Sequence, residues 1–456
     1  MVCSVLLLSL WLAPLATGGI PPGDPVPPDP APRWFKGNLH THSLWSDGND
    51  FPEMIAEWYR AHGYDFLALS DHNILSQGMR WMKVADIERR GGRDVLAKYR
   101  ARFGDHWVET RGGEPGPDGA VAPLEVRLKP LNEFRALVEE RGRFLLIQAQ
   151  EVTDALGRIP IHINAANLRD LITPQGTGGD PDADVADVMR RNLRAIEEQA
   201  RRTGQPILAH LNHPNYVWAV TAEEIAEVVE ERFFEVFNGH TGTNNAGDAQ
   251  HASTEVIWDV ANTIRLARLN AAPLYGLATD DSHSYHGEGD SDVSVPGRGW
   301  IMVRARHLTP ESLIRSIEAG DFYASTGVAL RDVRFDATTR TLTIDIEPMI
   351  DPATGASVAF TTRFIGTRRV FDDSSIEIRD AAGNELRTTR RYSADVGAVL
   401  AIAEGLNPSY SLKGDELYVR AVVTASIAPA RPTKDSPLMK AWTQPVGWVV
   451  GSVQPE

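Results

Sequence analysis

From Trp34 onward, short apolar segments typical of β-strands alternate with amphipathic segments typical of helices. Strands are predicted at residues 66–70, 144–150, 159–165, 206–211, 233–237 and 274–279. Helices are predicted between them, at residues 52–61, 132–141, 184–202 and 253–269. This βα rhythm constrains the fold strongly, because strands that are joined through helices usually pair in parallel. It predicts an α/β protein with a mainly parallel sheet or barrel.

The composition is that of an ordinary globular protein. Of the 456 residues, 42% are hydrophobic and 23% are charged, which excludes a disordered chain, a collagen-like chain and a multi-span membrane protein. The 46 basic and 61 acidic residues give a formal charge of −15. That charge argues against nucleic acid as a partner, since nucleic-acid binding normally needs a basic face. The length predicts two domains.

The boundary between the two predicted domains is indicated by a change in the hydrophobic pattern after Thr326. Alternating apolar and polar residues at 342–348, 375–380 and 416–423 predict antiparallel strands, with a turn at 380–385. We therefore expect a first domain at 34–328 and a small β-sandwich-like antiparallel β domain at 329–456. All thirteen histidines lie between His40 and His307, so metal chemistry is expected in the first domain.

The beginning of the chain is typical of a targeting segment. No charged residue precedes Asp24, and an apolar run at 5–15 is followed by small residues, the pattern of a signal peptide. The run lacks a basic start, so residues 1–20 are predicted to be either a signal peptide or an uncleaved N-terminal anchor, followed by a proline-rich linker at 21–33. A cleaved signal implies a periplasmic or secreted protein with no membrane span in its mature chain. The single cysteine, Cys3, lies in this segment, so any metal must be held by His, Asp and Glu.

Residues 77–130 are less regular than the rest of the first domain. They are too long for a plain connection between two elements, and they contain a turn-rich stretch at 112–119. Two interpretations remain open, an active-site lid and a surface insertion.

Histidine and carboxylate residues recur at one structural position, directly after predicted strands. His40 and His42 are two residues apart, so on an extended strand both rings point to one face, and Asp47 follows in a turn. The later members, each directly after a strand, are Asp71, His72, Glu151, His213, Asp281 and His283. Since the carboxyl ends of strands in a βα barrel meet at one rim, we expect these groups to form a metal site.

Two members have alternative interpretations. His162 lies inside the strand at 159–165, where it is either a core histidine or a ligand that reaches the same metal as Glu151 through a short hairpin. Asp71 either accepts a hydrogen bond from a ligating histidine, as metal sites usually require, or caps a loop.

The motifs HTHSLWSDG, LSDHN, NHPN and DDSH, together with Glu151, resemble the successive motifs of the polymerase and histidinol phosphatase (PHP) superfamily over residues 34–327. Within it, ATDDSHSYHG and SIEAGDFYASTG are most similar to the metallohydrolase branch that includes carbaryl hydrolases. The resemblance implies a distorted (βα)7 TIM-like barrel with a metal site at its C-terminal rim, followed here by the small β domain.

The resemblance also implies a set of metal ligands for two or three divalent ions, such as manganese, zinc or iron. His40, His42, Glu151 and Asp281 are expected to hold one ion, Glu151, His162 and His213 a second, and Asp47, His72 and His283 a third. Asp47 departs from the family pattern, because many members have histidine there. This departure leaves open whether two or three ions bind.

Divalent ions that share a carboxylate generate hydroxide near neutral pH and neutralise charge on phosphate oxygens. We therefore expect a phosphoesterase that uses a metal-bridging hydroxide on a small-molecule ester. Besides Glu151, the expected catalytic residues are His240, as an acid for the leaving group or a phosphate contact, and Arg298, as an anion contact.

Two alternative functions remain open. The same hydroxide can attack a carbonyl, which makes the protein a carbamate or carboxylic ester hydrolase of the carbaryl-hydrolase type. An alternative of another class is a non-catalytic binding protein.

Overall fold

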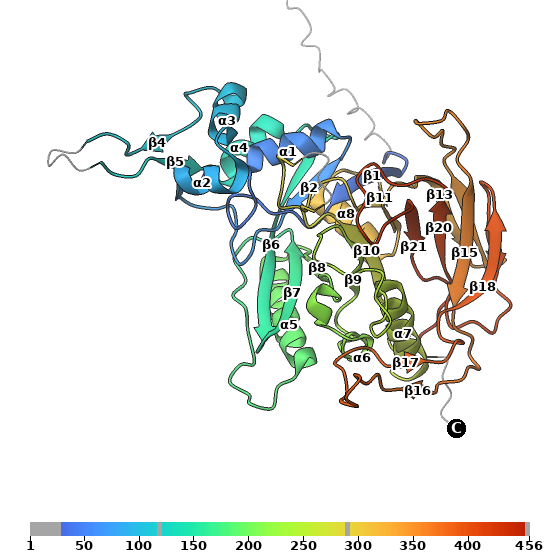
Figure 1. Ribbon diagram of the computed structural model, residues 1–456. Coiled ribbons are helices and arrows are strands. Elements are labelled where there is room, and N and C mark those ends of the chain that lie inside the picture. Colours follow the sequence, from blue (N-terminus) through green and yellow to red (C-terminus); the bar gives the residue numbers. More distant parts are fainter. Residues whose placement is uncertain (1–28, 116–120, 288–291, 452–456) are drawn as a thin grey trace, which may run out of the picture. The chain divides into compact units, whose positions relative to one another are not determined.

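The computed structural model describes residues 29–115, 121–287 and 292–451 (Figure 1). The chain divides into Met1–Ala31, of which only residues 29–31 are described, and a compact unit, Pro32–Glu456. The predicted signal segment and most of the predicted linker lie outside the described residues. Among the helices that the structure describes, none has the length and apolar character needed to cross a membrane.

Thirteen strands form the main sheet, in the order β10-β9-β8-β7-β6-β2-β1-β11-β12-β21-β20-β15-β18. Their bounds are β1 Arg33–Asn38, β2 Phe66–Leu69, β6 Leu145–Leu156, β7 Ile159–Ala166, β8 Leu208–Leu211, β9 Phe233–Asn238, β10 Tyr275–Thr279, β11 Trp300–Ala305, β12 Phe322–Ser325, β15 Phe360–Gly366, β18 Ala398–Glu404, β20 Arg420–Ala425 and β21 Lys440–Thr443. All six strands predicted for the first part of the chain are present. The mixed α/β class is confirmed.

The expectation of mainly parallel pairing in the first part of the chain is met only in half of the pairs there, since four pairs are parallel and four are antiparallel. The pairs β1–β2, β2–β6, β8–β9 and β9–β10 are parallel, and the other pairs are antiparallel. The reason lies in β6 and β7, which form a hairpin with Gly157 at φ 61° in its turn, a conformation that glycine adopts readily. From β12 the pairing passes directly to β21, so the closed barrel and the separate β domain remain predictions.

The described residues form eight helices: α1 Pro52–Ala61, α2 Val84–Gly91, α3 Val95–Phe103, α4 Leu131–Val138, α5 Val185–Thr203, α6 Ala222–Glu227, α7 Thr254–Ala267 and α8 Pro310–Glu318, with a 3-10 turn η1 at Tyr216–Trp218. The four predicted helices correspond to α1, α4, α5 and α7. Helix α5 begins where the Asp184 side chain accepts a hydrogen bond from the N–H of Asp187, and Gly204 follows its end at φ 67°. Both are common helix-end signals, so its ends differ from the predicted ones by a single residue.

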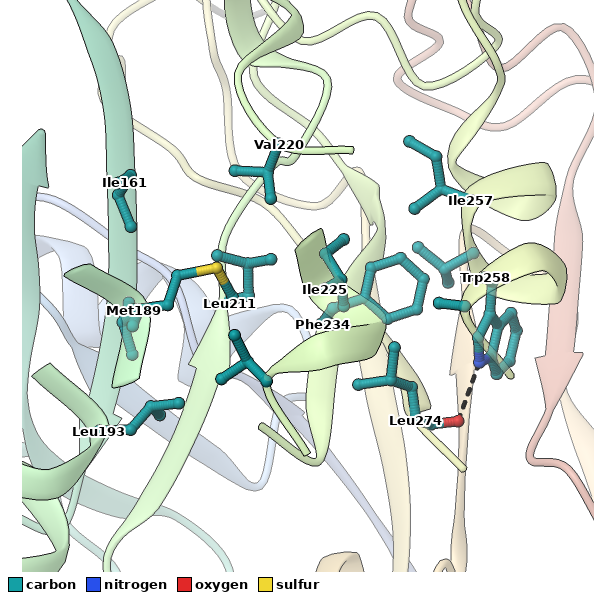
Figure 2. Close-up of a cluster of buried hydrophobic side chains, with 14 of the residues drawn as sticks. Ile161, Met189, Leu193, Leu211, Val220, Ile225, Phe234, Ile257, Trp258 and Leu274 are labelled. Atoms are coloured by element: carbon teal, nitrogen blue, oxygen red, sulfur yellow. Dashed lines mark hydrogen bonds between the residues drawn. The ribbon is translucent and has the colours of Figure 1, made fainter. Parts of the chain in front are cut away.

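Helices α5, α6 and α7 cover one side of the sheet through a common apolar cluster (Figure 2). Met189 and Leu193, four residues apart on α5, lie on one face of the helix. The Trp258 ring of α7 is fully buried, and its Nε1 donates to the carbonyl oxygen of Leu274 at 2.9 Å. Burying each large apolar side chain contributes about 1.5–3 kcal/mol, so this cluster fixes the helices on the sheet.

A second apolar cluster contains Leu208 of β8, Phe233 of β9 and Leu277 of β10. Two residues further along the same strands, and so on the same face, the side chains become polar: His210, Glu235 and Thr279, all fully buried. A polar layer therefore lies directly above an apolar one, toward the carboxyl ends of these strands.

The C-terminal strands add further sheets. Strands β13 Leu330–Asp336, β14 Thr341–Ile346 and β19 Ser409–Ser411 form one sheet, and β16 Ser375–Ile376 pairs with β17 Arg391–Tyr392. Only the first two residues of the strand predicted at 375–380 are extended in this way. The buried Arg420 of β20 joins this region to α7, since its Nε and Nη2 donate to Asp259 at 2.8 and 2.6 Å.

The described parts of the segment at 77–130, residues 77–115 and 121–130, pack against the loop that follows β1. They contain α2, α3 and a three-stranded sheet of β3 Arg80–Lys83, β5 Glu125–Leu128 and β4 Thr110–Arg111. Leu44 and Trp45 of the loop lie in the apolar cluster of this segment. Arg90 Nη1 donates to the Ser46 carbonyl oxygen at 2.6 Å. The segment therefore supports the loop at residues 44–46.

The same segment generates a prediction about pH. Glu53 of α1 is fully buried, and its Oε1 accepts hydrogen bonds from Tyr99 Oη at 2.5 Å and Trp107 Nε1 at 3.1 Å. Burial raises the pKa of Glu53 from 4.5 to about 7. A carboxyl group with a raised pKa in the folded state stabilises the protein at low pH, and that stability is lost as the pH rises from 4.5 to 7.

Glu53→Gln removes this titration and keeps the acceptor oxygen. The free energy of unfolding of the variant relative to the wild type should therefore rise by roughly 2–3 kcal/mol between pH 5 and pH 8, as measured by urea unfolding at several pH values. A difference that stays constant over this range contradicts the prediction, because a packing change alone does not depend on pH.

Candidate metal centre

The structure brings all nine predicted metal ligands into one connected group at the carboxyl ends of the strands. They come from the loops after β1, β2, β8 and β10 and from the hairpin β6–β7. The members are His40, His42, Asp47, His72, Glu151, His162, His213, Asp281 and His283, and their donor atoms form overlapping sets of three or four within 4.8 Å.

The first expected set is closely packed. His40 Nε2 lies 3.3 Å from Asp281 Oδ1, and His42 Nε2 lies 3.1 Å from the same oxygen. The two Nε2 atoms also lie 3.5 Å and 3.4 Å from the two oxygens of Glu151. The two-residue spacing of the histidines thus turns both rings to the same carboxylates.

Glu151 lies at the centre of the group. Its Oε1 lies 2.9 Å from His162 Nδ1 and 3.5 Å from His213 Nε2, which completes the second expected set. His162 therefore faces Glu151 across the hairpin and is not an isolated core histidine. Asn212 Nδ2 also donates to Oε1 at 2.8 Å.

The third expected set lies nearest to solvent. Asp47 is 52% exposed, and its Oδ2 lies 3.5 Å from His72 Nε2 and 3.5 Å from His283 Nε2. His72 Nδ1 also lies 2.7 Å from Glu151 Oε2, so Glu151, a member of the first expected set, also contacts the third set.

The charges of the group depend strongly on one another. Burial alone lowers the pKa of His40, but Asp281, Glu235 and Glu151 outweigh burial and raise this pKa well above its usual value. Burial and the neighbouring His283 lower the pKa of His42 to about 4. Protons on the imidazole rings balance the negative charge of the carboxylates. A divalent cation that binds to these residues can displace the protons and balance the same charge.

The donor set fits divalent ions. Buried polar atoms normally have hydrogen-bond partners, yet His40 Nε2, His42 Nε2 and Glu151 Oε2 have none within the described part of the chain. His42 Nε2 lies 3.4 Å from Glu151 Oε2, and His40 Nε2 lies 3.5 Å from the other oxygen of the same carboxylate, Oε1. Imidazole nitrogen and carboxylate oxygen are the ligands that zinc, iron and manganese take in proteins.

Asp71 acts as a loop cap. Its Oδ1 accepts from the N–H groups of Ser43 and Ser46 at 2.8 and 3.0 Å, and both serine hydroxyl groups also donate to its carboxylate. These bonds hold the loop between His42 and Asp47, so the first of the two interpretations, a bond from a ligating histidine, does not describe this residue.

Glu235 is a residue of the site that the sequence analysis missed. It lies in β9, and its Oε1 accepts a hydrogen bond from His40 Nδ1 at 2.7 Å. A signal was present, because Glu235 is the one carboxylate in the otherwise apolar sequence FFEVF. Most of the predicted ligands directly follow a predicted strand, whereas Glu235, like His162, lies within a strand.

His240 lies beside the predicted ligands, and Tyr216 lies beside His240. The ring of His240 is 5.3 Å from that of His283, and the ring of Tyr216 is 5.2 Å from that of His213 and 6.1 Å from that of His240. The N–H of Gly242 donates to His240 Nδ1 at 3.0 Å. This bond assigns the proton of the neutral ring to Nε2.

Arg298 lies beneath the loop that carries His240. It is buried, and its Nη1 donates to the carbonyl oxygen of Gly239 at 2.9 Å. Its backbone N–H donates to Asp280, next to Asp281. Its predicted contact with an anionic substrate stays a prediction.

Comparison with known proteins gives similarity at the level of solved structures. No family model matches the chain, and no curated protein matches it. A two-domain protein containing a predicted PHP-like metal-dependent phosphoesterase, from Bacteroides vulgatus, is 14% identical over 92% of this chain and 97% of that chain, with a TM-score of 0.37. PsfC from Pseudomonas syringae is 11% identical over 62% of this chain and 88% of that chain, with a TM-score of 0.30.

The unpartnered donor atoms generate a prediction about metal binding. Mn²⁺ or Zn²⁺ at a hundredfold excess over its dissociation constant should stabilise the protein by about 2.7 kcal/mol per ion, which raises the melting temperature by about 3 °C for a chain of this length. Glu151→Gln should lose most of this increase in a thermal unfolding experiment.

His106→Ala is the matched control for that experiment, because His106 is an exposed histidine outside the group. It should keep the full increase on addition of metal. An equal increase in the Glu151→Gln variant would show that the metal binds elsewhere.

Proposed function

We propose that the protein is a metal-dependent phosphoesterase of the PHP type that acts on a small-molecule ester. The observation that carries the proposal is the group of nine histidine and carboxylate residues around the buried Glu151. Burying charged groups costs free energy unless groups of opposite charge lie next to them. Divalent cations provide that opposite charge.

The proposed ions are two or three in number, of manganese, zinc or iron. His40, His42, Glu151 and Asp281 would hold the first, and the carboxylate of Glu151 would be shared with a second at His162 and His213. A third would lie at Asp47, His72 and His283. When bound, these ions supply Lewis acidity to the ester and to the attacking water.

The residues around these ligands order the site and shape its opening. Asp47, His72 and His283 are the more exposed ligands, with side chains 52%, 28% and 21% exposed, whereas His40 and His42 are fully buried. A substrate would therefore reach the group from the side of Asp47, His72 and His283. His240, next to His283, lies on this path.

We assign His240 the role of a hydrogen-bond donor to a substrate oxygen. Because Nδ1 accepts from the Gly242 N–H, a second ring proton could only be added there at the loss of that bond. Burial also lowers the pKa of His240, so the neutral ring with a proton on Nε2 is the form at neutral pH. A neutral donor stabilises charge that develops on an oxygen, and of the two roles expected for His240 we propose the phosphate contact.

The finer architecture and the location belong to the same proposal. We propose that residues 34–328 form a PHP-type (βα)7 barrel domain and residues 329–456 a β domain that packs against it. The signal-like sequence of the first twenty residues supports export to a periplasm or beyond.

A second candidate is hydrolysis of a carbamate or carboxylic ester of the carbaryl-hydrolase type. An aromatic ring beside the ligands favours it, because the ring of Tyr216 lies 5.2 Å from that of His213. An aryl group can pack on such a ring.

Turnover of three aryl substrates separates these candidates. The Mn²⁺- or Zn²⁺-loaded protein should hydrolyse an aryl phosphate monoester or diester, and His213→Ala should lower kcat/KM by about 100-fold or more, since even residues that only support a ligand contribute 10- to 100-fold. Turnover of an aryl carbamate alone assigns the second candidate. Bound metal with no turnover of any of the three favours a binding protein.

The role of His240 is tested by two substitutions. His240→Ala should lower kcat by about 100- to 1,000-fold, the loss that follows removal of one donor to a developing oxyanion, with unchanged metal content. His240→Gln, which can still donate from its amide, should recover part of the rate. A loss that is much larger for poor leaving groups than for 4-nitrophenolate would instead assign His240 as the acid for the leaving group.

A further inference from the structure

Glu235 is a fully buried carboxylate in a strand whose neighbouring residues are apolar. Its two oxygens accept four hydrogen bonds. Oε1 accepts from His40 Nδ1 and Thr279 Oγ1, each at 2.7 Å, and Oε2 accepts from the backbone N–H of His213 and from Asn238 Nδ2, each at 2.8 Å. Buried carboxylates are kept only where such partners compensate for lost hydration, so these contacts define what Glu235 does.

The contact with His40 fixes the protonation of that ring. Because Nδ1 donates to Glu235, the lone pair of the neutral ring is on Nε2. Nε2 is the atom that lies 3.3 Å from Asp281 Oδ1 and has no hydrogen-bond partner among the described residues. A carboxylate on the far nitrogen of a ligating histidine orients the ring and increases its basicity.

The contacts through Oε2 reach two residues with unusual backbone conformations. His213 has φ 20° and Asp281 has φ 47°, both in the left-handed region that residues with a side chain rarely adopt. Glu235 accepts the N–H of His213, and Asn238 Nδ2 donates both to Glu235 and to Asp281 Oδ2, the latter at 3.1 Å. Strained residues persist only where their surroundings hold them.

Glu235 thus contacts His40 and His213 directly and Asp281 through Asn238. The donor atoms of these three residues lie within 4.8 Å of one another. We infer that Glu235 is a positioning residue that prepares His40 and Asp281, ligands of the first proposed ion, and His213, a ligand of the second, to bind metal. The inference rests on the metal-dependent function proposed above. Asn238 extends the same support to the substrate side, because its Oδ1 accepts the N–H of His240 at 2.8 Å.

Metal binding by Glu235→Gln tests this role. The full-length protein is stripped of metal with a chelator and titrated with Zn²⁺ in competition with a chromophoric chelator, and with Co²⁺ while the visible spectrum is recorded. Glu235→Gln should lower the affinity for one ion by about 10- to 100-fold and change the Co²⁺ absorption, because the ring of His40 loses its fixed orientation. A structural role alone would lower the melting temperature without changing either readout.

Glu231→Gln is the matched control. Glu231 is also a buried glutamate, and it precedes the same strand at its opposite end, where its Oε1 accepts the N–H groups of Arg232 and Phe233. It should bind Zn²⁺ and Co²⁺ as the wild type does.

The possible failures are distinguishable. A Glu235→Gln variant with wild-type affinity and spectrum overturns this inference and leaves the proposed function in place. A wild-type protein that binds neither metal overturns both. If Glu235→Gln does not fold, Thr279→Val removes one donor to Oε1 with little change of shape. It should weaken binding in the same direction by a smaller factor, and unchanged affinity again overturns the inference.

Discussion

The rest of the structure depends on the ion pairs between the buried, ionised carboxylate of Glu151 and the histidine rings around it. Five imidazole rings lie within 2.7–3.5 Å of its two oxygens. They lower the pKa of Glu151 well below its usual value, although burial acts in the opposite direction. Removing one member of a buried charge set costs about 3–5 kcal/mol. Because the rings come from separate segments of the chain, the fold and the site stabilise each other.

Every second side chain of a β-strand lies on the same face, and this explains how such a polar group lies next to a large apolar core. Leu208, Phe233 and Leu277 form one layer of the interior, and the residues two positions further along these strands form the polar layer above it. The apolar layer excludes water from below. The polar layer, with Glu235 and Thr279, then supplies the hydrogen bonds that the ligands need on their inner side.

The sequence predicts the rim of the site well, because a residue directly after an apolar strand has a defined place in an α/β fold. His213 and Asp281 were found in this way. Glu235 was not, because its role depends on which residue faces it across the interior, and His40 is 195 positions away in the sequence. The pairing of β-strands is equally hard to predict, because it too depends on residues far apart in the sequence. The strand at 159–165 was predicted correctly, but apolar periodicity does not distinguish a parallel from an antiparallel neighbour. The pairing of β12 with β21 joins residues more than 110 positions apart.

Asp47 shows how the site and its supporting segments act together. The loop that carries it is held by Asp71 from one side and by Arg90 from the other. At Gly48 an added Cβ would lie 2.6 Å from the carbonyl group of His42, so the turn leaves no room for a side chain. A short carboxylate in this fixed loop reaches two histidines, where a histidine would add a bulkier neutral ring. Asp47 thus adds negative charge and an oxygen donor to the exposed set, beside the two imidazoles of His72 and His283.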